Sequence, residues 1–190
     1  MATYFPLNLK AWRNDEYGFT IRIAVPADYD ALVTAWAEIE EGRRSIARVN
    51  MLKESIERGW VIVAEERGDI FGYSDITPIY TKYSDFPVTH LAVSGVSPRD
   101  GGKYRKTGVH EVMSILRILG ILGKTQTACS YVDSESLLSR REAIAKKLGI
   151  PLTIVRGENN ITLNYDLTCD IKKIEKKIRE HLTSLKWHEA

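Results

Sequence analysis

The segment from Val96 to Gly120, VSPRDGGKYRKTGVHEVMSILRILG, contains residues that could hold a phosphate group. A strand that ends in a loop and opens a helix presents unpaired backbone N–H groups at the positive end of that helix. Glycines let a ligand approach the backbone, and cations add attraction. The segment therefore predicts an anion site, with a solvated surface turn as the alternative. The loop residues concerned are Gly101, Gly102, Gly108, Arg99, Lys103, Arg105 and Lys106.

Three common motifs are excluded by the spacing. GGKYRKTG does not fit the P-loop pattern G-x-x-x-x-G-K-[ST], and the dinucleotide fingerprint G-x-G-x-x-G is absent. The nucleophile elbow G-x-S-x-G is also missing, so spacing does not support a Ser-His-Asp triad. Cys129 and Cys169 lie far apart without a CxxC or Cys/His pattern, which indicates neither a disulfide framework nor a zinc site. No metal is expected.

The elements that must position this loop follow from the apolar spacing. Alternation and turn residues predict strands, and apolar residues three and four apart predict helices. Ser134 is placed to cap one helix, and Gly59, Gly123 and Gly149 to end three of them. The strands are predicted at 18–25, 60–80 as a hairpin around RGD, 87–96, 125–133, and 152–167 as a hairpin turned at GENN. The helices are predicted after Pro26, at 45–58, at 109–122, at 134–150 and from about 170.

This element order predicts an α/β (α+β) fold with a mixed, mostly antiparallel sheet and helices on both faces. The 190 residues suit one domain, at 44% hydrophobic and 27% charged residues. We expect an N-terminal extension at 1–17, the main domain at 18–168 and an amphipathic C-terminal helix at 169–190 that packs on it. No run reaches the ~18 apolar residues of a membrane helix, and no signal layout begins the chain. A soluble, cytoplasmic protein without a membrane partner is expected.

The chain resembles the GNAT superfamily of acyl-coenzyme A N-acyltransferases at two short motifs. The family signature is a strand, then Q/R-x-x-G-x-G/A, then a helix. RKTGVH, Arg105 to His110, matches its first four positions and has His110 at the last. AKKLGI, Ala145 to Ile150, is similar to the Leu-Gly-Phe-like helix end before the family's last hairpin. The resemblance extends from about Phe19 to Leu167, and RDGGKY, Arg99 to Tyr104, is a competing register for the first motif.

The resemblance implies that acetyl-coenzyme A, or another acyl-coenzyme A, is the co-substrate. It assigns the cofactor contacts to the strand before the loop and to the loop itself, with backbone N–H groups from Lys106 to His110 on the pyrophosphate. Arg105 would support that pyrophosphate as a charged group. The full set of predicted cofactor-binding residues is Val93, Val96, Arg105, Lys106, Thr107, Gly108, Val109 and His110.

The catalysis that the resemblance implies is direct attack of a deprotonated amine on the thioester, which needs positioning, a base and a proton donor. His90 in VTHLAV suits the base because histidine titrates near neutrality. Asp75 in GYSDIT, on the adjacent strand, is a second candidate, and Tyr131 is a candidate donor together with Ser130. Each of these also has a purely structural interpretation. The tyrosine donor of many family members falls at Ala145, which has no proton to donate.

The predicted function is therefore transfer of an acetyl or other acyl group to an amine of a small molecule, a protein or a nucleotide. The first alternative is a GNAT-shaped binding or structural protein without catalysis. The second is a nucleic-acid-associated modification protein, because the terminal helix carries DIKKIEKKIREHL, whose lysines could form a basic face. The net charge of +2 does not by itself indicate nucleic acid. A homodimer is left open.

Overall fold

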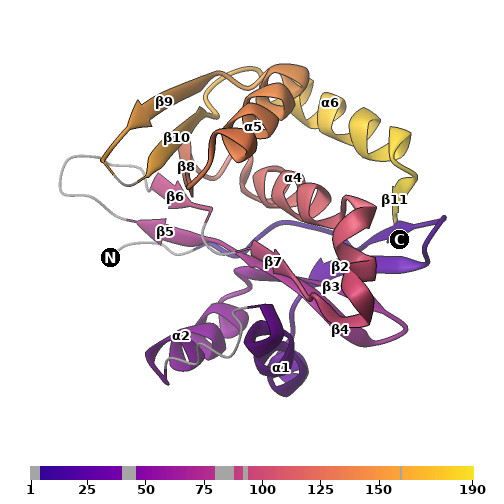
Figure 1. Cartoon of the computed structure of the whole chain (residues 1–190). Helices are drawn as coiled ribbons and strands as arrows, with labels where there is room; N and C mark the ends of the chain where they lie inside the picture. Colours follow the sequence, from indigo (N-terminus) through magenta and orange to yellow (C-terminus); the bar gives the residue numbers. More distant parts are fainter. Residues whose placement is uncertain (1–4, 40–45, 80–87, 92–93, 159) are drawn as a thin grey trace.

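The computed structural model describes residues 5–39, 46–79, 88–91, 94–158 and 160–190, and it shows an α+β fold built in layers. Helices α1 and α2 lie on one side of the strands, and α4, α5 and α6 lie on the other (Figure 1). The strands form two sheets, and together these sheets make up the layer between the two groups of helices. The predicted mixed, mostly antiparallel arrangement with helices on both faces is confirmed.

The first sheet has six strands in the order β11-β1-β2-β3-β4-β7, and its neighbours run antiparallel. The β3–β4 hairpin turns at Arg67 and Gly68, both at positive φ, as the RGD turn predicted. The strands are β1 (Trp12–Asn14), β2 (Phe19–Ile23), β3 (Val61–Glu66), β4 (Asp69–Asp75), β7 (Ser94–Val96) and β11 (Trp187–Glu189).

The second sheet has five strands in the order β5-β6-β8-β10-β9. Among the strand pairs in the described part of the chain, β6 with β8 is the parallel one. The predicted last hairpin is present as β9 with β10. The strands are β5 (Thr77–Ile79), β6 (Val88–His90), β8 (Thr127–Val132), β9 (Leu152–Arg156) and β10 (Ile161–Asp166).

The helices form where the apolar spacing predicted them. Ser134 caps α5 through a hydrogen bond to the Leu137 backbone, and Gly149 ends that helix in the left-handed conformation. A short helical loop separates β7 from α4. The helices are η1 (Pro26–Asp28), α1 (Tyr29–Ile39), α2 (Ile46–Glu57), α3 (Arg99–Gly102), η2 (Lys103–Thr107), α4 (Val109–Ile121), α5 (Glu135–Leu148) and α6 (Ile171–Ser184).

Two apolar cores lie on the two sides of the strands. One contains Leu32 and Trp36 of α1 against Val61 and Val63 of β3. The other is larger and surrounds α4, with contributions from both sheets and from α5 and α6. Helix α4 is buried on most sides, as its wide apolar stripe predicted. It is therefore the element against which the two sheets are held.

The predicted single strand at 87–96 divides into β6 and β7. Val88 to His90 pair with β8 in the second sheet, whereas Ser94 to Val96 pair with β4 in the first. An apolar run of this length cannot reveal the division, because the change depends on which strands lie beside each half. As a result, His90 belongs to the second sheet, whereas the loop before α4 follows a strand of the first sheet.

The two ends of the chain meet at one edge of the first sheet. Strand β1, from the predicted N-terminal extension, pairs with β2 and with the C-terminal β11. Helix α6 buries Ile174, Ile178 and Leu182 in the core around α4. The sequence analysis predicted α6 but neither of these two short strands.

An ion-pair network joins η1, the turn just before α1, to strands β2 and β3 of the first sheet, and it generates a pH prediction. Arg22 bonds both Asp28 oxygens, at 2.6 and 2.9 Å, and Glu65 Oε2 at 2.7 Å. These bonds hold the pKa of Asp28 below its ordinary 3.8, so its ionised carboxylate stabilises the fold above that pH and the stabilisation is lost as the pH falls. Asp28→Asn should lower the free energy of unfolding at pH 7 by about 1.5 kcal/mol or more, measured by urea denaturation.

The same measurement between pH 5 and pH 3 tests the direction in which the stabilisation by Asp28 depends on pH. The difference between the variant and the natural chain should narrow as the pH falls below 4. Asp30→Asn, at an exposed position in the first turn of α1, is the matched control and should change stability less. A difference that stays constant with pH would contradict the ion-pair assignment.

Candidate functional site

Strands β6 and β7 follow each other in the chain and have different neighbours, since β6 pairs with β8 and β7 pairs with β4. The backbone N–H of Leu91 donates to the Cys129 carbonyl at 2.7 Å, just past the parallel register that pairs His90 with Cys129. From Ser94 onward the strand pairs with β4. Strands β7 and β8 therefore diverge, and the amino end of α4 lies past β7 (Figure 1).

A pocket of about 270 Å³ lies at the end of β7. Ile39, Gly95, Val96, Arg105 and His110 line it, so α1, β7, η2 and α4 all contribute. The N-cap residue of α4 is Gly108, at φ 75°, which has no side chain of its own to cap the helix. The pocket thus combines a guanidinium with an uncapped helix end, which favours an anion.

The loop before α4 is anchored by an aromatic side chain. The Tyr104 ring is buried and stacks on Phe71, with 4.0 Å between ring centroids and an interplanar angle of 7°. Its hydroxyl donates to Glu66 Oε2 at 3.0 Å, and Lys103 Nζ lies 2.8 Å from the same oxygen. Lys103 is therefore engaged by Glu66 on the first sheet.

The two competing arginines have different partners. Arg99 pairs with Asp69 at 3.2 Å, donates to the Ile70 carbonyl and lies 3.6 Å from Glu38. Arg105 donates from Nε to the Val96 carbonyl at 3.2 Å and lines the pocket. The geometry supports the register that begins at Arg105.

The other predicted phosphate contacts lie around this pocket in different ways. Lys106 is exposed, and the Thr107 hydroxyl donates to the Tyr104 carbonyl at 2.7 Å. The Val109 side chain is buried in the core, so its backbone alone is available to a ligand. His110 lines the pocket with its half-buried side chain. Val93 lies outside the described residues.

Two of the three predicted catalytic residues, His90 and Tyr131, meet where β6 pairs with β8, whereas Asp75 ends β4 in the first sheet and is not on a strand adjacent to β6. The rings of His90 and Tyr131 lie edge to face, with centroids 4.9 Å apart. Tyr131 is 54% exposed, so an incoming molecule can reach this pair. Asp75 ends β4 two residues before Thr77, which is the backbone partner of His90.

His90 is suited to accept a proton at neutral pH. Burial lowers the pKa of His90 below 6.5, and the positive charge of Arg117 lowers it further. The imidazole is thus neutral at pH 7. Cys129 is a poor nucleophile by the same reasoning, because burial raises the pKa of its thiol.

The sequence analysis missed Arg117. It stands in SILRILGIL within α4, and its side chain is only 2% exposed. Its Nη1 donates to the Asp75 carbonyl oxygen at 2.8 Å. The sequence feature that could have identified Arg117 is a cation inside an otherwise apolar helical stripe.

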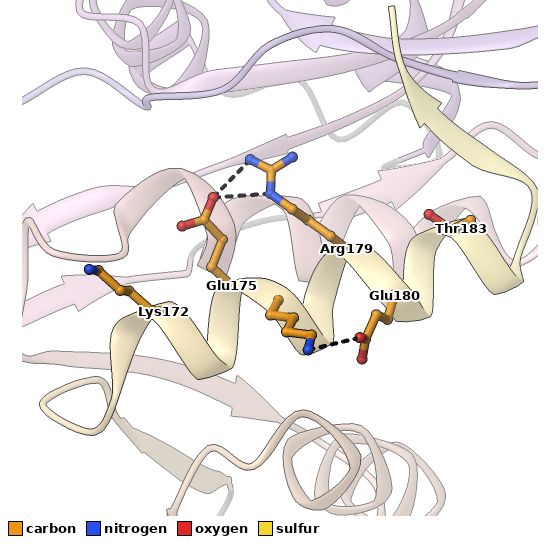
Figure 2. A pocket seen from close by; sticks show the side chains of 6 residues that line it. Lys172, Glu175, Arg179, Glu180 and Thr183 are labelled. Carbon is orange, nitrogen blue, oxygen red and sulfur yellow. Dashed lines mark hydrogen bonds and ion pairs between the residues drawn. The ribbon is translucent and has the colours of Figure 1, made fainter.

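The outer face of α6 does not form a uniformly basic stripe. Figure 2 shows the six side chains that line a hollow on this face: Lys172, Glu175, Lys176, Arg179, Glu180 and Thr183. Arg179 pairs with Glu175 at 2.9 Å, and Lys176 lies 3.9 Å from Glu180. The charges alternate along the helix and are partly neutralised in place.

Metal and membrane features were sought in the same residues. Within the described segments, no three histidine, cysteine, aspartate or glutamate side chains are grouped so that they could hold a metal ion. No helix in those segments combines the length and apolar character needed to cross a bilayer.

Comparison with known proteins gives a consistent structural result. No protein-family model matches the sequence, and no curated protein matches it. Among solved structures, a GNAT-family acetyltransferase from Bacillus cereus superposes with a TM-score of 0.51 at 18% identity, covering 77% of this chain and 94% of the other.

Two further structures match over similar lengths. The diaminobutyrate acetyltransferase EctA from Paenibacillus lautus, in complex with L-2,4-diaminobutyric acid and coenzyme A, has a TM-score of 0.55 at 15% identity, covering 80% of this chain and 96% of the other. A ribosomal-protein-alanine N-acetyltransferase from Brucella melitensis has a TM-score of 0.53 at 20% identity, covering 77% and 99%. The chain has the GNAT fold.

Two positions stand out within the GNAT fold because they differ from the family pattern that RKTGVH and AKKLGI resemble. His110 is a bulky residue at the edge of the pocket, where the signature has glycine or alanine. Ala145 is buried at 2% exposure in α5, so its side chain neither reaches solvent nor supplies a proton. A proton donor would have to come from elsewhere, and Tyr131 is the exposed hydroxyl beside His90.

Gly95 allows α1 to approach the strand beside the pocket. A Cβ atom at this position would lie 2.4 Å from Cγ2 of Ile39. Gly95→Ala should therefore lower the free energy of unfolding by about 1–3 kcal/mol, the usual cost of overpacking, measured by urea denaturation. Adding Ile39→Ala removes the clashing atoms, so the Gly95→Ala change should cost less in that background than in the natural chain. Equal costs in both backgrounds would contradict the described contact.

Proposed function

We propose that this chain is an N-acyltransferase that moves an acetyl or other acyl group from acyl-coenzyme A to an amine. The observation that carries the proposal is the pocket at the end of β7, where Arg105 and the uncapped end of α4 meet. The chain has the GNAT fold, and His90 lies on the strand that leads to this pocket. An anion site and a neutral base are thus joined by one strand.

The residues around the pocket fit a diphosphate. Backbone N–H groups from Lys106 to His110 would be the main donors, and Arg105 would add charge-assisted bonds. The pocket, at about 270 Å³, is just below the ~300–1,000 Å³ of sites that enclose whole small ligands, so it suits one part of a long molecule. We assign Val96 and Val93 to the neighbouring part of the coenzyme.

The proposed reaction uses His90 as the proton acceptor. The amine nitrogen loses a proton to His90 and attacks the thioester carbonyl carbon, so a C–N bond forms and the C–S bond breaks. The departing thiolate takes a proton, for which Tyr131 is the proposed donor. Asp75, at the end of β4, is the alternative proton acceptor. The proton held by His90 then passes to the tyrosinate, directly or through solvent, so both side chains return to their starting states.

The acceptor is proposed as a primary amine of a small molecule, a protein or a nucleotide. One structure with the same fold holds L-2,4-diaminobutyric acid, and another is named for acetylation of a ribosomal protein. These two cases support small-molecule and protein amines as classes. We propose a cytoplasmic location on the sequence pattern alone.

A second candidate function is acyl-coenzyme A binding without transfer. The buried Ala145 favours it, because the tyrosine donor of many family members is missing there. The two functions share the pocket and differ in whether His90 and Tyr131 do chemistry. Binding and turnover must therefore be measured separately.

Binding is tested by thermal melting with increasing acetyl-coenzyme A, which should raise the midpoint if the folded chain binds it. Gly108→Val should remove most of this stabilisation, because φ at Gly108 is 75° and a β-branched side chain would block the backbone. Arg105→Ala should weaken binding by about 1.5–3 kcal/mol, the range for hydrogen bonds to charged groups.

Lys103→Ala is the matched control, since Lys103 is engaged by Glu66 and should affect binding less. Loss of binding on substitution of Arg99 or Gly102, with Arg105 and Gly108 insensitive, would establish the alternative register. No midpoint shift at a large excess of acetyl-coenzyme A would reject the proposed function.

Turnover is tested with His90→Gln, using release of free coenzyme A in the presence of a panel of amines. The variant should keep its acetyl-coenzyme A stabilisation and lose about 10²–10⁴-fold in kcat, the range for removal of a general base. In the natural chain, kcat should fall as the pH drops through the lowered pKa of His90, because the protonated imidazole cannot accept a proton. His188→Gln, in the terminal strand β11, is the control and should keep full activity. Binding without turnover in the natural chain would support the second candidate.

A further inference from the structure

Arg117 is a charged residue in the middle of the apolar helix α4. Its neighbours Leu116 and Ile118 are buried in the core, and the arginine is itself among the largest fully buried side chains. Removing a guanidinium from water carries a large free-energy cost that excellent partners must offset. An arginine at such a position indicates a role that an apolar side chain cannot perform.

One hydrogen-bond partner of Arg117 lies where the chain crosses between the two sheets. Arg117 Nη1 donates to the backbone carbonyl of Asp75 at 2.8 Å. Asp75 pairs with Val61 at the end of β4 in the first sheet, and Thr77 begins β5 in the second. We call Asp75 to Thr77 the seam.

The seam is directly connected to His90. Thr77 is the backbone partner of His90 in the antiparallel pair of β5 and β6. The residues just before Asp75 and His90, Ser74 and Thr89, are fully buried and polar. A shift of the seam would therefore move His90 through a single backbone pair, inside a polar part of the core.

We propose that Arg117 is a positioning residue for acyl transfer: it holds the seam in place and keeps His90 uncharged and correctly placed. The proposal rests on the function proposed above for His90. Arg117 is not itself expected to touch either substrate. It acts through its bond to the Asp75 carbonyl and through its charge.

The charge effect has a definite sign. Burial lowers the pKa of Arg117 to about 9, with repulsion from Arg141 adding to the effect, so the side chain is still charged at pH 7. A nearby cation disfavours a second positive charge, which lowers the pKa of His90 beyond the effect of burial. Asp75 and Tyr165 act on Arg117 in the opposite direction.

The other titratable groups near His90 do not replace this effect. Tyr131 contacts the His90 ring, Cys129 is the backbone partner of His90 on β8, and Asp75 ends β4 two residues before Thr77. Burial raises the pKa of the Cys129 thiol, so it is neutral at pH 7. Asp75, as an anion, would favour a protonated His90. Arg117 supplies the opposing positive charge.

Stability and function can be separated at this position. Replacing a buried charge by an apolar residue of similar size is often neutral or stabilising. Arg117→Met removes both the charge and the hydrogen-bond donor, whereas Arg117→Gln removes the charge and keeps a polar, though shorter, side chain that can donate a hydrogen bond. Arg140→Met, on the exposed face of α5, is the matched control for loss of an arginine charge.

The experiment measures the His90 pKa by NMR titration of the full chain, together with kcat and KM for acetyl-coenzyme A. In Arg117→Met, the His90 pKa should rise toward 6.5, and kcat should fall at least fivefold with KM within twofold. In Arg117→Gln, the pKa should rise in the same way, and kcat should recover toward the natural value at pH 8, where His90 is neutral in every variant. Arg140→Met should match the natural chain in all three quantities, and the His188 resonances serve as an internal reference.

An unchanged His90 pKa in both Arg117 variants, or full kcat in Arg117→Met at pH 7, would overturn the proposal. If Arg117→Met does not fold, the charge effect is tested with Arg117→Gln. An unchanged His90 pKa in Arg117→Gln then overturns the proposal. Failure of the proposed function has a different signature, because the natural chain would then neither bind acetyl-coenzyme A nor release coenzyme A. In that case the NMR titration still decides whether Arg117 controls the protonation of His90.

Discussion

The change of partner along one strand, from β8 to β4, is the constraint on which the rest of the structure depends. His90 pairs with β8 in the second sheet, and Gly95 and Val96 pair with β4 in the first. Backbone hydrogen bonds in a sheet leave little freedom for a residue to move, so the two pairings fix how far the histidine lies from the pocket. The core around the buried helix α4 takes side chains from both sheets and so holds them together.

In the loop between β7 and α4, several side chains anchor the loop to the fold, while Arg105 and the backbone before α4 lie at the pocket. Tyr104 is stacked in the core on Phe71, and Arg99 and Lys103 are held by acidic residues of the first sheet and α1. These side chains fix the loop in place. The uncapped end of α4 and Arg105 are then left facing the pocket. A rigid loop of this kind has its donors oriented before a ligand arrives, which lowers the entropy cost of binding.

Burial of charge gives the site its chemical character. Arg117 lies in the core, where its Nη1 donates to the Asp75 carbonyl, and burial of His90 lowers the pKa of that histidine. A histidine on an exposed strand would be partly protonated near neutral pH. Placing it beside a buried cation keeps its imidazole neutral, while the exposed Tyr131 leaves one side of the pair accessible.

The amino-acid sequence by itself determined the order and type of most elements, because apolar spacing and turn residues act locally. Ser134 and Gly149 marked the ends of α5, and the glycine-rich segment before Val109 marked the site at the start of α4. The sequence also singled out His90, Tyr131 and Asp75 by their chemistry, without showing that the His90 and Tyr131 rings meet. The tertiary structure decided that the 87–96 strand divides between two sheets, that Arg105 lines the pocket while Arg99 is held by Asp69, and that Arg117 is buried. Strand pairing, ion pairs and burial depend on residues far apart in the chain, so local sequence patterns do not predict them.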